Sequence, residues 1–161
     1  MTGGLKGRDT IGRMPQSLAT VLVHAVFSTK DRTPWLAPAI RQELHPYIVG
    51  VLANIGCPSI QTGGVEDHVH ALFRLSRTMS LAQVIEKTKT SSAKWMKAKG
   101  MRDFSWQAGY GAFSVGQTEA DRVIAYIKGQ EEHHRKVSFE DELRGMLREA
   151  GLKFDERYLW D

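Results

Sequence analysis

Two histidines that stand two residues apart, His68 and His70, are the side chains in this sequence best placed for metal chemistry. They lie in a run of alternating apolar and polar residues, which predicts a β-strand whose successive side chains point to opposite faces. Both histidines then share one face, and the apolar face consists of Val69, Ala71, Phe73 and Leu75. Two imidazoles one strand repeat apart can hold a divalent metal. An isolated His-x-His motif is weak, however, and the spacing also fits two solvent-facing histidines.

A tyrosine four residues before a glutamine is the second candidate for chemistry. Thr118 and Asp121 have the form of a helix cap, and the helix that they open contains both residues. Tyr126 and Gln130 therefore project from one helical face, with Arg122 one turn earlier. A helix tyrosine whose ring packs on a sheet and whose hydroxyl reaches water would explain Tyr126 without any chemistry.

Hydrophobic periodicity predicts the helices that surround these motifs. Apolar residues recur every three or four positions over residues 38–55, which is typical of an amphipathic helix. Pro46 removes one backbone donor within it, so a kink or break is expected there. Ser80 and Gln83 have the form of a capping box that opens another helix, which stops at Gly100.

Strand patterns complete the predicted architecture. Strands are expected over residues 20–27 and 59–62, in the histidine run, and within residues 104–115, and a last helix from Ser138 to Ala150. The order is strand, helix, strand, strand, helix, strand, then helices. This is the split βαβ arrangement of an α+β, ferredoxin-like fold, with an antiparallel sheet, helices on one face and a C-terminal helical extension. The second face of the sheet is expected to be open.

Other polar residues have less specific interpretations. His24, in the first predicted strand, is interpreted as a half-buried strand histidine rather than a metal ligand. Several cations could contact nucleic-acid phosphates or simply be solvated. These candidate DNA-binding residues are Lys30, Arg32, Lys87, Lys94, Lys97 and Arg122.

Length and composition indicate one domain. The chain has 161 residues, a net charge of +4 and a single cysteine, so it can bury a core but cannot form an internal disulfide. It contains no apolar run long enough for a membrane span and no signal-peptide pattern, and we expect it to be cytoplasmic. Residues 1–13 are polar and rich in glycine, which predicts a disordered extension before a domain over residues 14–161.

Three motifs in order give the chain a resemblance to a known family. They are HVH at residues 68–70, WQAGYGAFSV at residues 106–115 and YIKGQEEHHRK at residues 126–136. Together they resemble the single-tyrosine HUH transposases of simple bacterial insertion sequences (IS200-like) and their REP-associated tyrosine relatives. His133 and His134 match this pattern too, and capping of a helix C-terminus is an adequate account of them.

The resemblance implies an activity and a set of site residues. His68 and His70 would bind Mg²⁺ or Mn²⁺, and Gln130 would complete the protein's share of the coordination. Tyr126 would attack a phosphate of single-stranded DNA and form a 5′-phosphotyrosine. The implied partners are single-stranded DNA with hairpin ends and a second copy of the chain, in a homodimer in which the tyrosine helix of one subunit can serve the histidines of the other.

Three alternatives remain open from the sequence. A domesticated relative would cut repeated palindromes for its host. A non-catalytic ferredoxin-like module would bind nucleic acid without cutting it. Metal-dependent hydrolysis with water as the nucleophile would leave Tyr126 dispensable.

Overall fold

The computed structural model describes residues 16–157 and 159–160. The disordered extension predicted for residues 1–13 lies outside these residues. The described chain contains a four-stranded antiparallel sheet in the order β2-β3-β1-β4. Its strands are β1 (Leu22–Ser28), β2 (Ser59–Gly64), β3 (His68–Arg74) and β4 (Gly111–Val115). This order, with a helix after β1 and after β3, confirms the predicted α+β, ferredoxin-like split βαβ arrangement.

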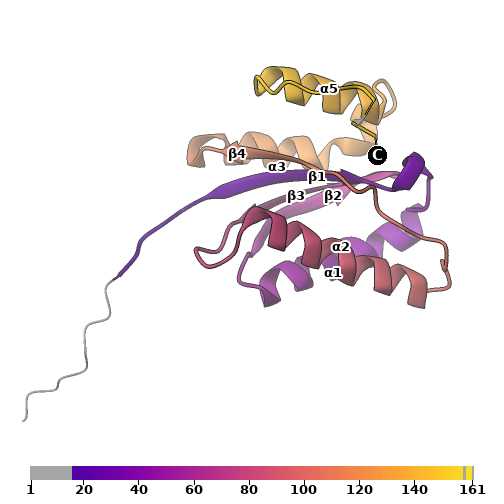
Figure 1. Cartoon of the computed structure of the whole chain (residues 1–161), viewed down its shortest axis with the longest axis horizontal. Helices are drawn as coiled ribbons and strands as arrows, with labels where there is room; N and C mark the ends of the chain where they lie inside the picture. Colours follow the sequence, from indigo (N-terminus) through magenta and orange to yellow (C-terminus); the bar gives the residue numbers. More distant parts are fainter. Residues whose placement is uncertain (1–15, 158, 161) are drawn as a thin grey trace, which may run out of the picture.

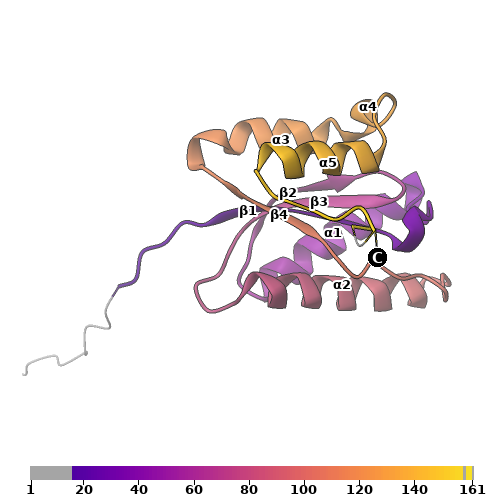
Figure 2. The same cartoon turned by 45° about the horizontal axis from the view of Figure 1, so that its top comes forward.

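Two long helices cover one face of the sheet, as predicted. They are α1 (Pro38–Asn54) and α2 (Leu81–Ala98), and Figures 1 and 2 show them together in one layer. Ser80 and Gln83 form the predicted capping box at the start of α2. The helix α1 continues through Pro46 without the break that the sequence suggested. The main apolar core lies between this layer and the sheet, and on β1 and β3 it contains Val23, Ala25, Phe27, Val69, Ala71 and Phe73.

The C-terminal helices cover the other face, which the sequence analysis expected to be open. They are α3 (Ala120–Lys128), α4 (Gln130–His133) and α5 (Phe139–Glu149), and Figure 2 shows α3 and α5 side by side on the side of the sheet opposite α1 and α2. Two smaller apolar clusters hold them there. Leu72 and Ile127 belong to the cluster under α3, and Val26 and Leu143 to the cluster under α5. The central strands are therefore buried on both faces.

Two of the three helix N-caps that the sequence predicted are present in the structure. Ser138 caps α5 by accepting a hydrogen bond from the backbone of Asp141, as predicted. The cap predicted at Thr118 is wrong, because residues 117–119 form a short 3₁₀ turn and α3 begins at Ala120 with no side-chain cap. The chain bends at Gly129, so α3 and α4 are separate helices.

The end of the described chain is tied back to the sheet layer. The side chain of Gln107 donates a hydrogen bond to the carbonyl of Leu159 at 2.7 Å. The ring of Trp160 lies 5.3 Å from the guanidinium of Arg32 and 5.2 Å from that of Arg144. These contacts hold the chain that follows α5 against the loop after β1. Among the described residues, no helix is long and apolar enough to cross a bilayer.

Candidate functional site

The two histidines of the strand motif lie at the centre of the molecule, on the face of β3 that α3 and α5 cover. His68 pairs with Ser28 and His70 with Val26 across β1. The two imidazoles share one face, as predicted, but both are fully buried instead of facing solvent. A polar side chain is rarely buried without hydrogen-bond partners, so the groups around the pair decide what it can do.

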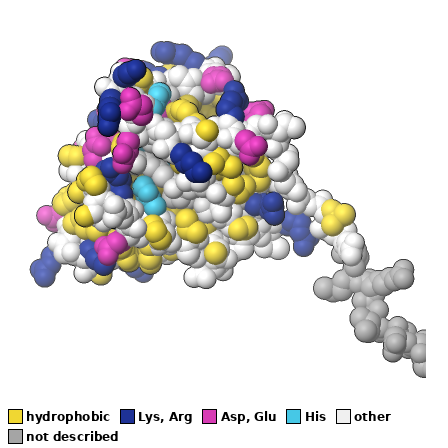
Figure 3. Space-filling model, turned by 180° about the vertical axis from the view of Figure 1, so that it is seen from behind, with side chains coloured by type: hydrophobic (Ala, Val, Ile, Leu, Met, Phe, Trp, Pro, Cys, Tyr) yellow, Lys and Arg dark blue, Asp and Glu magenta, His cyan; other side chains and the backbone are white. Residues whose placement is uncertain are grey.

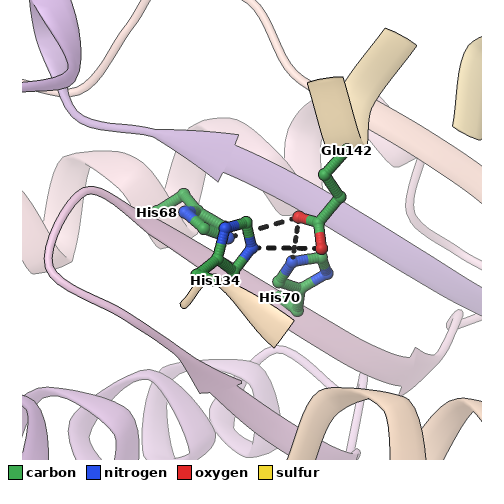
Figure 4. Close-up of side chains that lie close together, drawn as sticks. All are labelled: His68, His70, His134 and Glu142. Atoms are coloured by element: carbon green, nitrogen blue, oxygen red, sulfur yellow. Dashed lines mark hydrogen bonds and ion pairs between the residues drawn. The ribbon is translucent and has the colours of Figure 1, made fainter. Parts of the chain in front are cut away.

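A single carboxylate, from Glu142 on α5, meets both histidines (Figure 4). Its Oε1 atom lies 2.9 Å from His70 Nε2 and 3.3 Å from His68 Nε2. The side chain of Glu142 is 1% exposed. The helix α5 therefore inserts a negative charge between two buried imidazoles, and the sequence analysis did not anticipate this.

The other oxygen of the same carboxylate contacts side chains from the helices that follow β4. The hydroxyl of Tyr126 donates a short hydrogen bond to Glu142 Oε2, and the amide of Gln130 donates another at 3.0 Å. The Nε2 atoms of His133 and His134 each lie 3.1 Å from this oxygen. The predicted tyrosine, glutamine and histidines thus converge within one chain.

Each imidazole of the strand pair also has a partner on its second ring nitrogen. Asp67 Oδ1 lies 2.7 Å from His68 Nδ1, and His24 Nε2 lies 2.8 Å from His70 Nδ1. With a proton on Nδ1 donated outward, each ring would leave the lone pair of Nε2 free for a cation held beside the oxygens of Glu142 and Gln130. His24, interpreted from the sequence as a half-buried histidine, is buried and positions His70.

The ionisation of this cluster follows from burial and from the Glu142 charge. Burial lowers the pKa of His70 and, to about 3, that of His24. Burial acts on His68 in the same direction, but the Asp67 and Glu142 carboxylates outweigh it and raise the pKa of His68 to about 9. Burial would raise the pKa of Glu142, but contacts with His134, His68 and His70 hold it well below its usual range.

The nucleophile candidate is held in its protonated form in this arrangement. Burial and the neighbouring Glu142 carboxylate raise the pKa of the Tyr126 phenol well above its usual value. Attack by this oxygen therefore requires loss of the proton as the new bond forms.

The cluster has the composition of a metal site. Donor atoms of His68, His70, His134 and Glu142 all lie within 4.8 Å of one another. The buried Nε2 atoms of His133 and His134 form no hydrogen bond of acceptable geometry with any group in residues 16–157 and 159–160. Imidazole nitrogens that lie 3.1 Å from a carboxylate oxygen without hydrogen-bond geometry to it fit a bound cation. Gln130 Oε1, at 3.0 Å from His68 Nε2, is close enough to join the same ion.

A pocket gives access to Tyr126 between α3 and α5. It has a volume of about 430 Å³, and its lining includes His24, Arg122, Tyr126, His133 and Glu142. The opposite charges on the face drawn in Figure 3 are interspersed, and they form no large patch of one sign there. Arg122 is the one lysine or arginine among the described residues that line the pocket, and it also pairs with Glu119 at 3.1 Å.

The candidate DNA-binding residues are not gathered at this pocket. Arg122 lies one turn before Tyr126 and lines the pocket. Arg32 pairs with Glu140 of α5 and stacks on Trp160, and Lys30 is exposed at the end of β1. The sheet separates the pocket from α2, which carries the three exposed lysines Lys87, Lys94 and Lys97.

The sequence did contain a sign of Glu142. In the last helix the apolar residues Phe139, Leu143 and Leu147 form a stripe, and an acidic residue at position 142 falls on that stripe. A charge on the buried face of an amphipathic helix indicates a partner elsewhere in the fold. No sequence pattern indicated a role for Asp67, because its partner is the adjacent residue, His68.

Comparisons with known proteins place this chain in a family. A family model described as "Transposase IS200 like" matches residues 17–130. The fold is similar to a Deinococcus radiodurans R1 structure described as a candidate transposase, with a TM-score of 0.58 and 17% identity over 73% of this chain and 96% of that one. It is also similar to a REP-associated tyrosine transposase bound to a REP hairpin, with a TM-score of 0.58 and 14% identity over 79% of this chain and 76% of that one. A comparison with curated protein sequences gives no match. The family model spans most of the chain and both strand histidines, and this chain therefore belongs to the IS200-like transposases.

Proposed function

We propose that this transposase cuts and rejoins single-stranded DNA, with Tyr126 as nucleophile and a divalent metal held by His68, His70 and Gln130. The observation that carries the proposal is the convergence of these groups on one carboxylate. The Tyr126 hydroxyl and the two strand histidines contact opposite oxygens of Glu142 within the same chain. A tyrosine with a merely structural role would not need to lie beside a buried histidine pair.

The cutting step follows from the chemistry of a phenol. The Tyr126 oxygen attacks phosphorus and forms a 5′-phosphotyrosine, while the bond from phosphorus to the 3′ oxygen breaks. The proton that the phenol gives up is balanced by the proton that the leaving 3′ oxygen takes up to become a hydroxyl. Because a phenol leaves more readily than an alkoxide, a new 3′-hydroxyl can attack the phosphotyrosine and release Tyr126. Rejoining therefore needs no ATP. Arg122, on the wall of the pocket, can bind the phosphate that is attacked.

The ligands proposed for the metal indicate which ion would bind and what chemistry it would supply. A divalent ion held there supplies a Lewis acid that polarises the scissile phosphate and offsets charge on the leaving oxygen. The carboxamide oxygen of Gln130 is a hard donor beside two imidazoles, a set that suits Mg²⁺ or Mn²⁺ and leaves positions for phosphate oxygens.

The DNA substrate is expected to contain hairpins. Support comes from the structurally similar REP-associated transposase, which is bound to a REP hairpin. We propose that the chain works as a homodimer in the cytoplasm. In this chain Tyr126 and the strand histidines contact the same Glu142 side chain, which supports a site formed within one subunit.

A host role on repeated palindromes is the second candidate. The same structural neighbour favours it, because that protein is associated with REP sequences. The DNA around the gene separates the two: terminal hairpins flanking the gene favour a mobile element, and dispersed palindromes elsewhere favour the host role.

Incubation with end-labelled, hairpin-bearing single strands and Mn²⁺ tests the proposal on a denaturing gel. A protein-linked DNA species should form with the wild-type chain, require the metal and disappear in Tyr126→Phe. His68→Ala should abolish it while the far-UV circular dichroism spectrum stays unchanged. Cleavage that survives Tyr126→Phe would indicate water as the nucleophile, and binding without cleavage in the wild type would indicate a non-catalytic module.

A further inference from the structure

The two oxygens of Glu142 face two different parts of the site. Oε1 is directed at the Nε2 atoms of His68 and His70, and Oε2 at the Tyr126 hydroxyl and the Gln130 amide. Figure 4 shows the carboxylate descending from α5 onto the imidazoles of β3. The family match ends at residue 130, so Glu142 lies outside the residues that the family model covers.

The spacing of the donor atoms is that of neighbouring ligands on one ion. Two ligand atoms about 2.1 Å from an ion and at right angles to each other are about 3.0 Å apart. Glu142 Oε1 lies 2.9 Å from His70 Nε2 and 3.3 Å from His68 Nε2, and Gln130 Oε1 lies 3.0 Å from His68 Nε2. A metal titration separates these contacts from hydrogen bonds, which have similar lengths.

Charge favours the same assignment. Two neutral imidazoles and a carboxamide would leave a dication uncompensated in a fully buried site, and a buried charge without a counter-charge is costly. Glu142 is 1% exposed and lies among imidazoles, so its negative charge would compensate such an ion directly. His68, His70, Gln130 and Glu142 together would supply four donors and leave two positions of an octahedral ion for phosphate oxygens.

We propose that Glu142 is a metal ligand through Oε1 and, through Oε2, holds the Tyr126 hydroxyl in place. This inference rests on the proposed function, because it concerns the same metal and the same nucleophile. One rigid carboxylate then fixes the distance between the metal and the attacking oxygen. The helix α5 is part of the site rather than an appendage to it.

The metal half is tested by the affinity of the full-length chain for Mn²⁺, measured by electron paramagnetic resonance of free Mn²⁺. Loss of groups that merely orient metal ligands costs about 10- to 100-fold in affinity, so loss of a direct ligand in Glu142→Gln should weaken binding by more than about 100-fold. The matched control is Glu86→Gln, which removes the same charge from an exposed position of α2, on the other face of the sheet, and should change the affinity by less than about twofold.

Two outcomes distinguish this inference from the proposed function. If His68→Ala abolishes Mn²⁺ binding and Glu142→Gln binds as the wild type does, the metal site stands and Glu142 is not a ligand. If His68→Ala leaves binding unchanged, the metal site of the proposed function is wrong and the inference fails with it.

The nucleophile half is tested on the wild-type chain, so it does not depend on the folding of a Glu142 variant. With tyrosine labelled by ¹³C at Cζ, and Tyr126→Phe used to assign the signal, saturation with Mg²⁺ should shift the Tyr126 resonance, because the same carboxylate then binds the ion. A Tyr126 resonance that stays in place when Mg²⁺ is bound would overturn the link between metal and nucleophile.

Discussion

At the scale of single residues, the site depends on groups that orient the imidazoles as well as on the imidazoles themselves. Asp67 accepts from His68 Nδ1, and its backbone carbonyl is fixed by the amide of Thr29 at 2.8 Å. A histidine that donates its second nitrogen to a carboxylate is a more basic metal ligand with a defined ring orientation. The aspartate should therefore affect metal affinity without touching the metal.

We expect Asp67→Ala to weaken Mn²⁺ binding by about 10- to 100-fold, because His68 loses its orienting acceptor. Calorimetric titration of wild-type and variant chains measures the effect. Glu66→Gln is the matched control, since Glu66 is an exposed acidic neighbour and should bind Mn²⁺ like the wild type. Equal affinities for Asp67→Ala and wild type would show that Asp67 does not support the site.

At the scale of elements, the position of Tyr126 depends on how closely α3 packs on β2. A Cβ atom at Gly63 would lie 2.9 Å from Ile127 Cγ2 and 3.2 Å from the Ile127 carbonyl. The absence of a side chain at Gly63 therefore allows the backbone of α3 to approach the sheet next to Tyr126. The neighbouring Gly64 is constrained more tightly, because a Cβ there would lie 2.2 Å from the His68 carbonyl.

Gly63→Val should push α3 away from the sheet and destabilise the chain by about 1 to 3 kcal/mol, the usual cost of overpacking. The displaced tyrosine should form the DNA adduct more slowly. Mn²⁺ affinity should fall less than in His68→Ala, because the two histidines on β3 stay in place and only Gln130, which follows α3, moves with the helix. Urea unfolding, adduct formation and Mn²⁺ titration measure the three effects. Gly50→Ala is the control, because nothing lies within 4 Å of a Cβ at Gly50, and it should not destabilise α1. A Gly63→Val chain as active as the wild type would contradict the packing account.

Element-level features were predictable from the sequence where their causes are local. The Ser80 capping box, the Ser138 cap and the alternation around His68 each involve residues within a few positions of one another. The cap at Thr118 failed because a 3₁₀ turn competes for the same residues. The cover over the second face could not be read from periodicity, since an amphipathic helix does not specify which face of a sheet it packs against.

At the scale of the whole molecule, the site joins parts of the chain that are distant in sequence. Glu142 follows His70 by 72 residues, and no spacing rule relates a strand histidine to a residue on the last helix. The sequence and the family resemblance together indicated His68, His70, Tyr126 and Gln130 as site residues, and the fold brings these four together. They did not indicate the buried carboxylate at the centre, because its role appears only when α5 lies on the sheet.

The buried cluster should make the stability of the metal-free chain depend on pH in both directions. The pKa of His68 is raised to about 9 from an ordinary 6.5, so its stabilising contribution is complete below pH 6.5 and is lost as the pH rises through 9. The pKa of His24 is lowered to about 3, so folding favours its neutral form and stability falls as the pH drops from 6.5 toward 3.

Thermal unfolding in EDTA should therefore give the highest Tm near pH 6.5. On either side, the free energy of unfolding should fall by about 1.4 kcal/mol per pH unit for each group that titrates. His24→Phe should reduce the loss on the acid side, because that side chain no longer takes up a proton on unfolding. A Tm that is the same from pH 4 to pH 9 would contradict this assignment of charges.

The central claim is that Tyr126 becomes covalently joined to DNA, and mass spectrometry of the trapped complex tests it most directly. After reaction of the full chain with a hairpin-bearing single strand and Mn²⁺, nuclease and protease digestion should leave a nucleotide attached through phosphate to the peptide that contains Tyr126. We predict this modification at Tyr126 alone and its absence when EDTA is present. Cut DNA with an unmodified Tyr126 peptide, or a nucleotide on another residue, would contradict the account.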